Sequence, residues 1–179
     1  MQASAASSFN ARAETLAEKP AFRKALEKRR CVIPADGFYE WRKNADGSKT
    51  PMYITLASEG VFAFAGLFET WKDPLGEEVK TCTIITTGPN GLLAGVHDRM
   101  PAILSPEGVK AWLAGTGEEK VLELLKAYPA EQMKMRPVGR GVNSAAREGA
   151  ELIAPVADVP VAEKKQRGKG EMPGQGALF

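Results

Sequence analysis

The chain of 179 residues is long enough for one domain with a buried core. Its 24 lysines and arginines nearly balance its 22 acidic residues, and the net charge of +2 excludes a strong overall attraction to nucleic acid, so any such affinity must come from local patches. The sequence has no apolar run of about 18 residues and no secretory signal pattern, so it predicts neither a membrane span nor export. Cys31 and Cys82 stand far apart without a CxxC pair, which argues against a zinc site or disulfide framework and suits the cytoplasm.

The first part of the chain predicts a flexible lead and then a helix. Residues 1–8 are mostly small and lack hydrophobic periodicity, as is typical of a flexible segment. Thr15-Leu16-Ala17-Glu18 has the pattern of a capping box, and Pro20 suits a position near a helix start. Apolar residues at helical spacing extend this helix to about Arg29. Its other face is basic and is either solvated or turned toward phosphates.

The rest of the chain predicts strands joined by turns, and further helices. Two turns are indicated by their composition, at Asn44–Gly47 and Asp73–Gly76. Helices are expected to begin at Ser105-Pro106-Glu107 and to span Glu118–Ala127. The expected strands are Cys31–Arg42, Thr50–Leu56, Val61–Trp71, Glu78–Thr87, Gln132–Val138 and Leu152–Val156. Sequential strands of this kind predict an α+β fold with a largely antiparallel sheet and peripheral helices.

One carboxylate stands among three aromatic residues in Pro34-Ala35-Asp36-Gly37-Phe38-Tyr39-Glu40-Trp41. Apolar surroundings raise the pKa of a carboxyl group toward the range useful for proton transfer. Glu40 is therefore a candidate acid or base. The alternative is a surface strand on which Glu40 points outward and only adds solubility.

His97 is the only histidine, and it lies in the segment Gly95-Val96-His97-Asp98-Arg99-Met100-Pro101. Loops on a rigid scaffold often carry catalytic groups, and a histidine side chain titrates near neutral pH. These features make His97 a candidate for proton transfer. Structural roles remain the alternatives, and for Asp98 the alternative is a turn former.

No nucleophile is evident from motifs. Cys31 and Cys82 lie within apolar strand runs, where buried thiols are usually inert, so a cysteine hydrolase that pairs Cys82 with His97 ranks low. The sequence has no G-x-S-x-G elbow and no glycine-rich phosphate loop. Neither a serine hydrolase nor a nucleotide cofactor is predicted, and no metal site is recognisable.

Three segments occur together in a fixed order: Asn10-Ala11-Arg12-Ala13-Glu14, then Arg30 to Trp41, and later His97-Asp98-Arg99-Met100-Pro101, with Val142-Asn143-Ser144 near the end. Together they resemble the SOS response-associated peptidase (SRAP) family from about Phe9 to Val156. The resemblance implies a barrel-like core over residues 9–160. The linker-like composition of residues 161–179 separately predicts a disordered basic tail.

This resemblance implies a bacterial DNA-damage protein, cytoplasmic and associated with the nucleoid, that captures abasic sites in single-stranded DNA without a cofactor. In the family, an N-terminal cysteine exposed by removal of the initiator methionine forms a thiazolidine crosslink with the open-ring sugar aldehyde. By this match Asn10 positions the reacting end, Glu40 acts as general acid or base, and His97 assists ring opening and proton transfer.

The resemblance also implies contacts with the DNA backbone. Arg12 and Arg99 are expected to hold phosphates, and Thr86 is expected to add a backbone contact. A surface ion pair is the alternative for each arginine. We expect that alternative less for Arg12 and Arg99 than for Arg23 on the helix face.

The start of the sequence departs from the family pattern. Family members open with Met-Cys-Gly-Arg and an N-terminal portion rich in strands, whereas this sequence opens Met1-Gln2-Ala3-Ser4. We therefore expect a chain that lacks the N-terminal strands and cannot crosslink, with an exposed sheet edge that invites pairing with a separate N-terminal fragment. The alternative function is a binding module that only holds single-stranded DNA or a partner.

The tail ends in Gln175-Gly176-Ala177-Leu178-Phe179. This resembles the Gln-x-x-Leu-Phe peptides by which bacterial repair proteins bind the DNA polymerase sliding clamp. Gln175, Leu178 and Phe179 are the expected contact residues, because a mobile linker ending in apolar side chains can fill a partner's pocket. So short a pattern also arises by chance.

Overall fold

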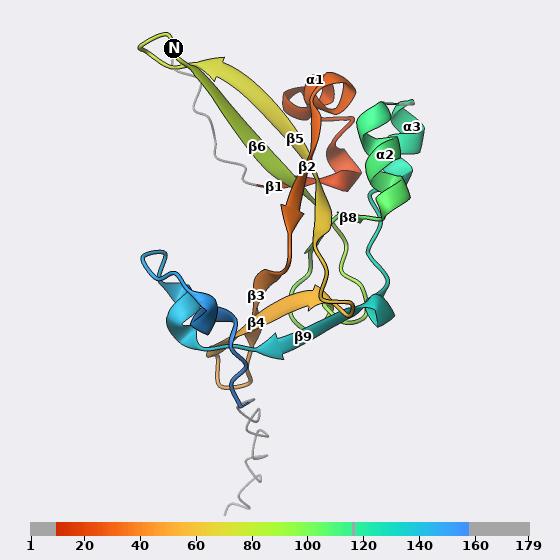
Figure 1. The fold of residues 1–179 in the computed structure, drawn as a ribbon. Coiled ribbons are helices and arrows are strands. Elements are labelled where there is room, and N and C mark those ends of the chain that lie inside the picture. The colour runs from red at the N-terminus through yellow and green to blue at the C-terminus, as the bar shows by residue number, and fades with distance from the viewer. Residues whose placement is uncertain (1–9, 116, 158–179) are drawn as a thin grey trace, which may run out of the picture.

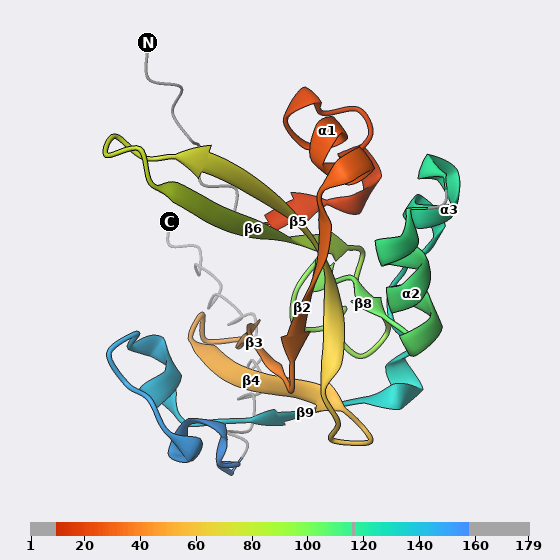
Figure 2. The same cartoon turned by 45° about the horizontal axis from the view of Figure 1, so that its top comes forward.

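Two β-sheets and a group of helices form the structure, a computed structural model that describes residues 10–115 and 117–157 (Figure 1). The helices pack beside the first sheet, and the second sheet lies across the lower ends of β2 and β5 in the views of Figures 1 and 2. The α+β class with peripheral helices is confirmed. None of the helices in the described residues is long and apolar enough to cross a membrane.

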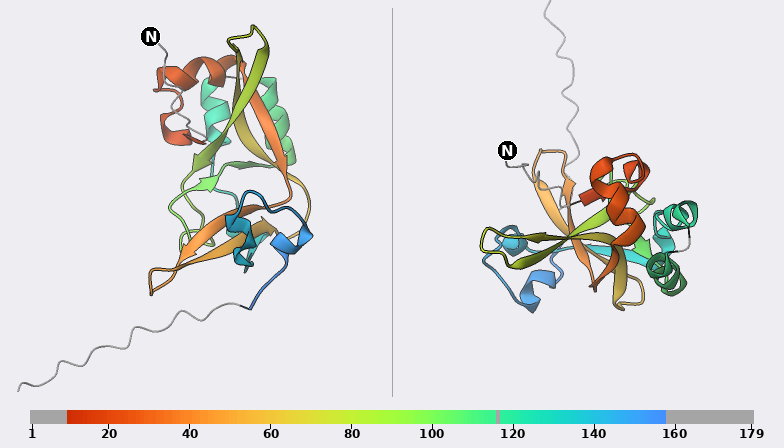
Figure 3. Two further views of the ribbon diagram at one scale, coloured as in Figure 1. Left: turned by 90° about the vertical axis from the view of Figure 1, so that its left-hand side faces the viewer. Right: turned by 90° about the horizontal axis from the view of Figure 1, so that it is seen from above.

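The first sheet is built around a long antiparallel hairpin that projects from the body (Figures 1 and 3). Its turn is stabilised by the Asp73 carboxylate, which accepts the N–H groups of Leu75 and Glu77 at 2.8 and 2.9 Å. The central strand order is β1-β6-β5-β2, and only the β1–β6 pair is parallel among these neighbours. The strands are β1 (Asn10–Arg12), β2 (Arg30–Ala35), β5 (Phe62–Lys72), β6 (Glu78–Thr87), β7 (Met100–Pro101) and β8 (Ile103–Leu104).

The second sheet contains β3 (Phe38–Lys43), β4 (Lys49–Leu56) and β9 (Met133–Pro137), all antiparallel. The single strand expected over Cys31–Arg42 is wrong, because the chain leaves the first sheet after β2 and enters the second at β3. Gly37 lies at this corner. A Cβ atom on Gly37 would lie 2.3 Å from ring atoms of the buried Tyr53, so glycine allows the two segments to approach.

Helices α1 (Pro20–Lys28), α2 (Pro106–Ala114) and α3 (Glu118–Glu123) share one hydrophobic cluster with the first sheet. The Ser105 hydroxyl accepts the N–H of Gly108 at 3.0 Å, so the expected cap of α2 is confirmed. The capping box at Thr15 is wrong. Helix α1 begins at Pro20 after Lys19 without a side-chain cap, because proline has no N–H to satisfy and its backbone is already suited to a first helical turn.

Four short 3₁₀ helices are also present in the described residues: η1 (Ala13–Thr15), η2 (Ala130–Gln132), η3 (Arg140–Asn143) and η4 (Ala150–Ile153). The strand expected over Leu152–Val156 is wrong, since this segment forms η4 and only one β-bridge, between Val138 and Pro155. Helix α3 is also shorter than expected and ends at Glu123.

Side-chain alternation gives the first sheet two different faces. Ala11, Leu67 and Ile85 are buried against the helices, at 1%, 2% and 0% exposure. Their neighbours along the strands, Asn10 and Arg12 on β1, therefore point to the opposite face. The face opposite this helix-packed cluster carries the first two candidate residues.

Candidate functional site

Strand β1 brings Asn10 and Arg12 beside the end of β6. In the parallel pairing, Asn10 lies opposite Ile84 and Arg12 opposite Thr86. Both β1 side chains are exposed, whereas Thr86 is buried and its hydroxyl donates to the carbonyl oxygen of Ala11 at 3.4 Å. Two segments more than 70 residues apart in sequence thus form one polar strip at the sheet edge.

Arg99 extends this strip from the loop after β6. Its guanidinium forms a bidentate ion pair with Glu14, with N–O distances of 2.8 and 2.9 Å. It also donates to the carbonyl oxygen of Thr86 at 2.5 Å. We expected a surface ion pair less for Arg12 and Arg99 than for Arg23, but Arg99 forms one. Arg12 has no ion pair with another described residue. The bidentate pair, which we call the Arg99–Glu14 fork, lowers the pKa of the Glu14 carboxyl group, because the hydrogen bond with Arg99 favours the charged form.

His97 is half-exposed and has two neighbours at the same ring nitrogen. The backbone N–H of Arg99 donates to Nδ1 at 3.0 Å, and an Asp98 carboxylate oxygen lies 3.1 Å from that atom. The first contact requires a bare Nδ1, whereas the second is attractive only when Nδ1 carries a proton. The two contacts therefore favour different positions of the proton on the ring.

Glu40 lies on β3 opposite the buried Met52, so its side chain points toward the core side of the second sheet. Burial raises the pKa of the Glu40 carboxyl group, and the neighbouring Asp98 carboxylate adds to the increase. The His97 ring and a backbone hydrogen bond at Trp41 act in the opposite direction. Glu40, His97 and Asp98 thus share one electrostatic neighbourhood, and Glu40 is not the outward-pointing residue of the alternative interpretation.

The cysteines differ from expectation. Both were expected to be buried, but Cys82 is exposed and Cys31 is half-buried. Burial raises the pKa of the Cys31 thiol, and the nearby Cys82 raises it further. A high pKa disfavours the reactive thiolate. In the described residues, the polar contacts of His97 are with Leu93, Asp98 and Arg99, so no contact supports a Cys82–His97 hydrolase.

Two contributing residues were missed as such. Glu14 was named only as the last residue of the Asn10–Glu14 segment. Its place just after the Asn-Ala-Arg strand was the signal that could have indicated its role. Asn143 was likewise noted only within a motif. Its side-chain oxygen accepts the indole N–H of Trp41 at 2.8 Å and ties η3 to the strand that carries Glu40.

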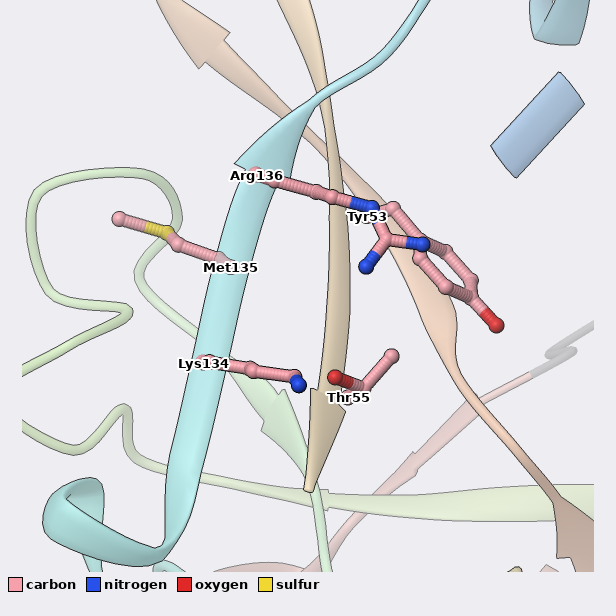
Figure 4. Close-up of a pocket in the computed structure, with 5 residues that line it drawn as sticks. All are labelled: Tyr53, Thr55, Lys134, Met135 and Arg136. Atoms are coloured by element: carbon pink, nitrogen blue, oxygen red, sulfur yellow. The ribbon is translucent and has the colours of Figure 1, made fainter. Parts of the chain in front are cut away.

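A small pocket lies elsewhere, on the outer face of the second sheet (Figure 4). Tyr53 follows Met52 on β4, so it points away from the side that Glu40 occupies. The Arg136 guanidinium lies 5.2 Å from the Tyr53 ring centroid and donates to Ile153 O, and Lys134 pairs with Glu59. These basic groups are already engaged, and the pocket contains none of the candidate residues. Its lining is Tyr53, Thr55, Lys134, Met135 and Arg136.

Three other expectations concern a metal site, the end of the chain and the basic face of α1. Within residues 10–115 and 117–157, no cluster of three or more His, Cys, Asp or Glu side chains is arranged to hold a metal ion. Gln175, Leu178 and Phe179 lie outside the described residues. Arg23 is an exposed residue of α1.

Comparison with known proteins identifies the family. The family model described as SOS response associated peptidase (SRAP) matches residues 1–145. The abasic site processing protein YoqW of Bacillus subtilis (strain 168) is 51% identical over 147 residues, covering 81% of this chain and 66% of that protein. The abasic site processing protein YedK of Escherichia coli (strain K12) is 34% identical over 151 residues, covering 83% and 67%.

The fold comparison agrees. A crystal structure of a protein from Bacteroides thetaiotaomicron superposes with a TM-score of 0.78 at 34% identity, covering 83% of this chain and 66% of that one. The chain thus spans about two thirds of the length of the curated relatives described above. The family resemblance seen in the three segments is confirmed, and the chain belongs to the SOS response-associated peptidase family.

Proposed function

We propose that this chain binds single-stranded DNA at abasic sites and takes part in processing them. Two relatives are named abasic site processing proteins, at 51% and 34% identity. One observation carries the proposal. The loop that contains Arg99 joins the exposed side chains of Asn10 and Arg12 on β1 to the group formed by Glu40, His97 and Asp98. Such an arrangement offers a cation for a phosphate beside groups that can move protons.

The proposed roles follow from exposure and protonation. Arg12 is the phosphate contact, because its side chain is exposed and has no ion pair with a described residue. Asn10, on the same face of β1, orients the reacting end. Glu40 keeps its proton to a higher pH than an exposed carboxyl group, which suits it to donate a proton, and His97 is the second proton carrier.

The chemistry needs both proton carriers. The abasic sugar is mostly a closed hemiacetal. Opening it removes a proton from the anomeric hydroxyl and delivers one to the ring oxygen. In the crosslink that the family resemblance implies, an N-terminal amine then attacks the aldehyde carbon and water leaves, giving an imine. The neighbouring thiol adds to the imine carbon and closes a thiazolidine, with loss of one water overall and no change of oxidation state.

Replacing Arg12 with alanine is expected to weaken binding to an abasic single strand and to reduce its salt dependence. One lost phosphate contact lowers the slope of log K against log salt by about 0.7 for single-stranded DNA. Fluorescence anisotropy at several salt concentrations measures both quantities. Arg23→Ala is the matched control, because it removes the same charge from the exposed face of α1. Equal slopes for the wild type and Arg12→Ala would contradict the assignment.

A polypeptide with this 179-residue sequence is expected to bind abasic DNA without a covalent crosslink. Its second residue is Gln2, and neither Cys31 nor Cys82 can supply an amine and a thiol from one N-terminal residue. A denaturing gel after incubation with an abasic oligonucleotide tests this, and a stable adduct would contradict it. The positive control is the same chain extended upstream by a segment that opens Met-Cys-Gly-Arg, which is expected to form the adduct.

The same extended chain separates the enzyme from a binding module. If Glu40→Gln and His97→Ala leave its crosslinking rate unchanged while Arg12→Ala weakens binding, Glu40 and His97 carry no proton-transfer role and residues 1–179 contribute only DNA binding. A loss of rate in the first two variants supports the proton-transfer roles.

A further inference from the structure

The side chain of Arg99 uses most of its donors within the protein. A guanidinium has five N–H groups. Two donate to the Glu14 carboxylate, one donates to the Thr86 carbonyl oxygen, and Nε lies 3.4 Å from the Thr86 hydroxyl oxygen. Four of the five N–H groups are thus used, and the fifth is on Nη1. Only 20% of this side chain is exposed, so Arg99 is held as part of the scaffold.

The backbone of the same residue contacts the candidate proton carrier. Its N–H donates to His97 Nδ1 at 3.0 Å. A ring nitrogen that accepts a hydrogen bond carries no proton, so in the neutral ring the proton is on Nε2. Arg99 therefore links two features. Glu14 and Thr86 hold its side chain, and its backbone N–H contacts Nδ1 of His97.

The position of this backbone N–H decides between two partners for Nδ1. Asp98 Oδ1 lies 3.1 Å from the same nitrogen and would favour a proton there. The charged groups at the ring are Asp98 and Arg99 from its own loop and Glu40 from β3. If the Arg99 backbone moved away, Nδ1 would keep only the Asp98 carboxylate, and the proton would shift toward Nδ1.

We infer that Glu14 is a positioning residue that acts on His97 through Arg99. By holding the guanidinium against Thr86, Glu14 keeps the Arg99 backbone N–H at His97 Nδ1 and the neutral ring in its Nε2–H form. The inference rests on the proposed function only for the use of that proton. The tautomer itself is a property of the free protein.

Nitrogen NMR of the imidazole tests this directly, because the chain has a single histidine. In ¹⁵N-labelled protein at about pH 8, where a histidine ring is neutral, the wild type is expected to show a bare Nδ1 and a protonated Nε2. Glu14→Gln removes the charge and one acceptor oxygen from the fork. It is expected to lower the ratio of the Nε2–H to the Nδ1–H form about fivefold, which corresponds to one hydrogen bond of about 1 kcal/mol.

Two further variants make the test specific. Arg99→Lys loses the planar fork and is expected to cause the same change, with no additional change when combined with Glu14→Gln. Glu18→Gln is the matched control, because it removes the same charge from an exposed residue that has no ion pair with a described residue. It is expected to leave the tautomer ratio at the wild-type value.

An unchanged tautomer ratio in Glu14→Gln would overturn the inference, whether or not the unfolding midpoint falls, because a fall in stability alone would show a merely structural role. A change of the same size in Glu18→Gln would also overturn it. Failure of the proposed function would appear instead as an absence of abasic-site binding by the wild type. That result leaves the NMR comparison intact.

Discussion

Replacing Glu40 with glutamine is expected to slow abasic-site crosslinking by about 10²–10⁴-fold, the usual contribution of a general acid or base. Glutamine has nearly the same size as glutamate, so it fills the same place opposite Met52 but cannot give up or accept a proton. The rate of adduct formation in the chain extended upstream by a Met-Cys-Gly-Arg segment measures the effect. A rate within threefold of the wild type would contradict the proposed role.

The same substitution is expected to stabilise the folded chain at neutral pH. Burial raises the pKa of Glu40 in the folded state, so folding favours the protonated carboxyl group. The stability from this preference is present below the unfolded pKa of about 4.3 and is lost as the pH rises through the raised folded value. As the pH rises, the wild type thus loses a contribution that does not exist for glutamine, which is neutral at every pH.

Urea denaturation at two pH values measures this second effect. The midpoint of Glu40→Gln is expected to exceed that of the wild type at pH 7 and to approach it at about pH 3, below the unfolded pKa, where the carboxyl group is protonated in both states. Glu148→Gln, at an exposed position without an ion pair to a described residue, is the control and is expected to show no such pH-dependent difference. A lower midpoint for Glu40→Gln at pH 7 would contradict the desolvation argument.

Replacing Trp112 with alanine is expected to destabilise the fold by about 3–5 kcal/mol, as is typical when a large core aromatic is truncated. The Trp112 side chain is fully buried, at 0% exposure, and its indole N–H donates to the carbonyl oxygen of Cys31 at 2.9 Å. The Arg30 guanidinium lies 5.7 Å from the ring centroid and donates to the Trp112 carbonyl oxygen at 2.7 Å. One side chain thus joins α2 to β2, the strand that leads to Glu40.

Chemical denaturation of the 179-residue chain measures this loss. Trp112→Phe keeps most of the apolar contact but loses the indole donor, so it is expected to cost about 1–3 kcal/mol. Leu113→Ala is the control, because Leu113 is the next residue and is 50% exposed, and its effect is expected to stay within about 0.5 kcal/mol. A loss below about 1 kcal/mol for Trp112→Ala would contradict the central role of this contact.

Much of the fold could be predicted from local patterns. The turn residues at Asp73–Gly76 and the β-rich runs beside them predicted the long hairpin correctly, because each element depends on neighbours close in sequence. The Ser105 cap was equally predictable. The capping box at Thr15 failed, since the same residue types occur in 3₁₀ turns and the helix start was determined by Pro20.

The candidate site was only partly predictable. Glu40 and His97 were found because their residue types and surrounding motifs indicate proton transfer. The ion pair between Arg99 and Glu14 joins residues 85 positions apart, and no local pattern reveals such a partner. The exposure of Cys82 was missed for a similar reason, because an apolar run does not say which face of a strand is covered.

The sequence by itself determined the family, the α+β class and the residues able to carry charge or protons, because these depend on residue type and local order. Only the tertiary structure decided how they work together. It split the expected strand at Gly37, turned Glu40 toward the core and fastened Arg99 with Glu14 and Thr86. The physical reason is that desolvation and hydrogen bonding depend on which distant segments pack together, and pairing between strands determines that packing.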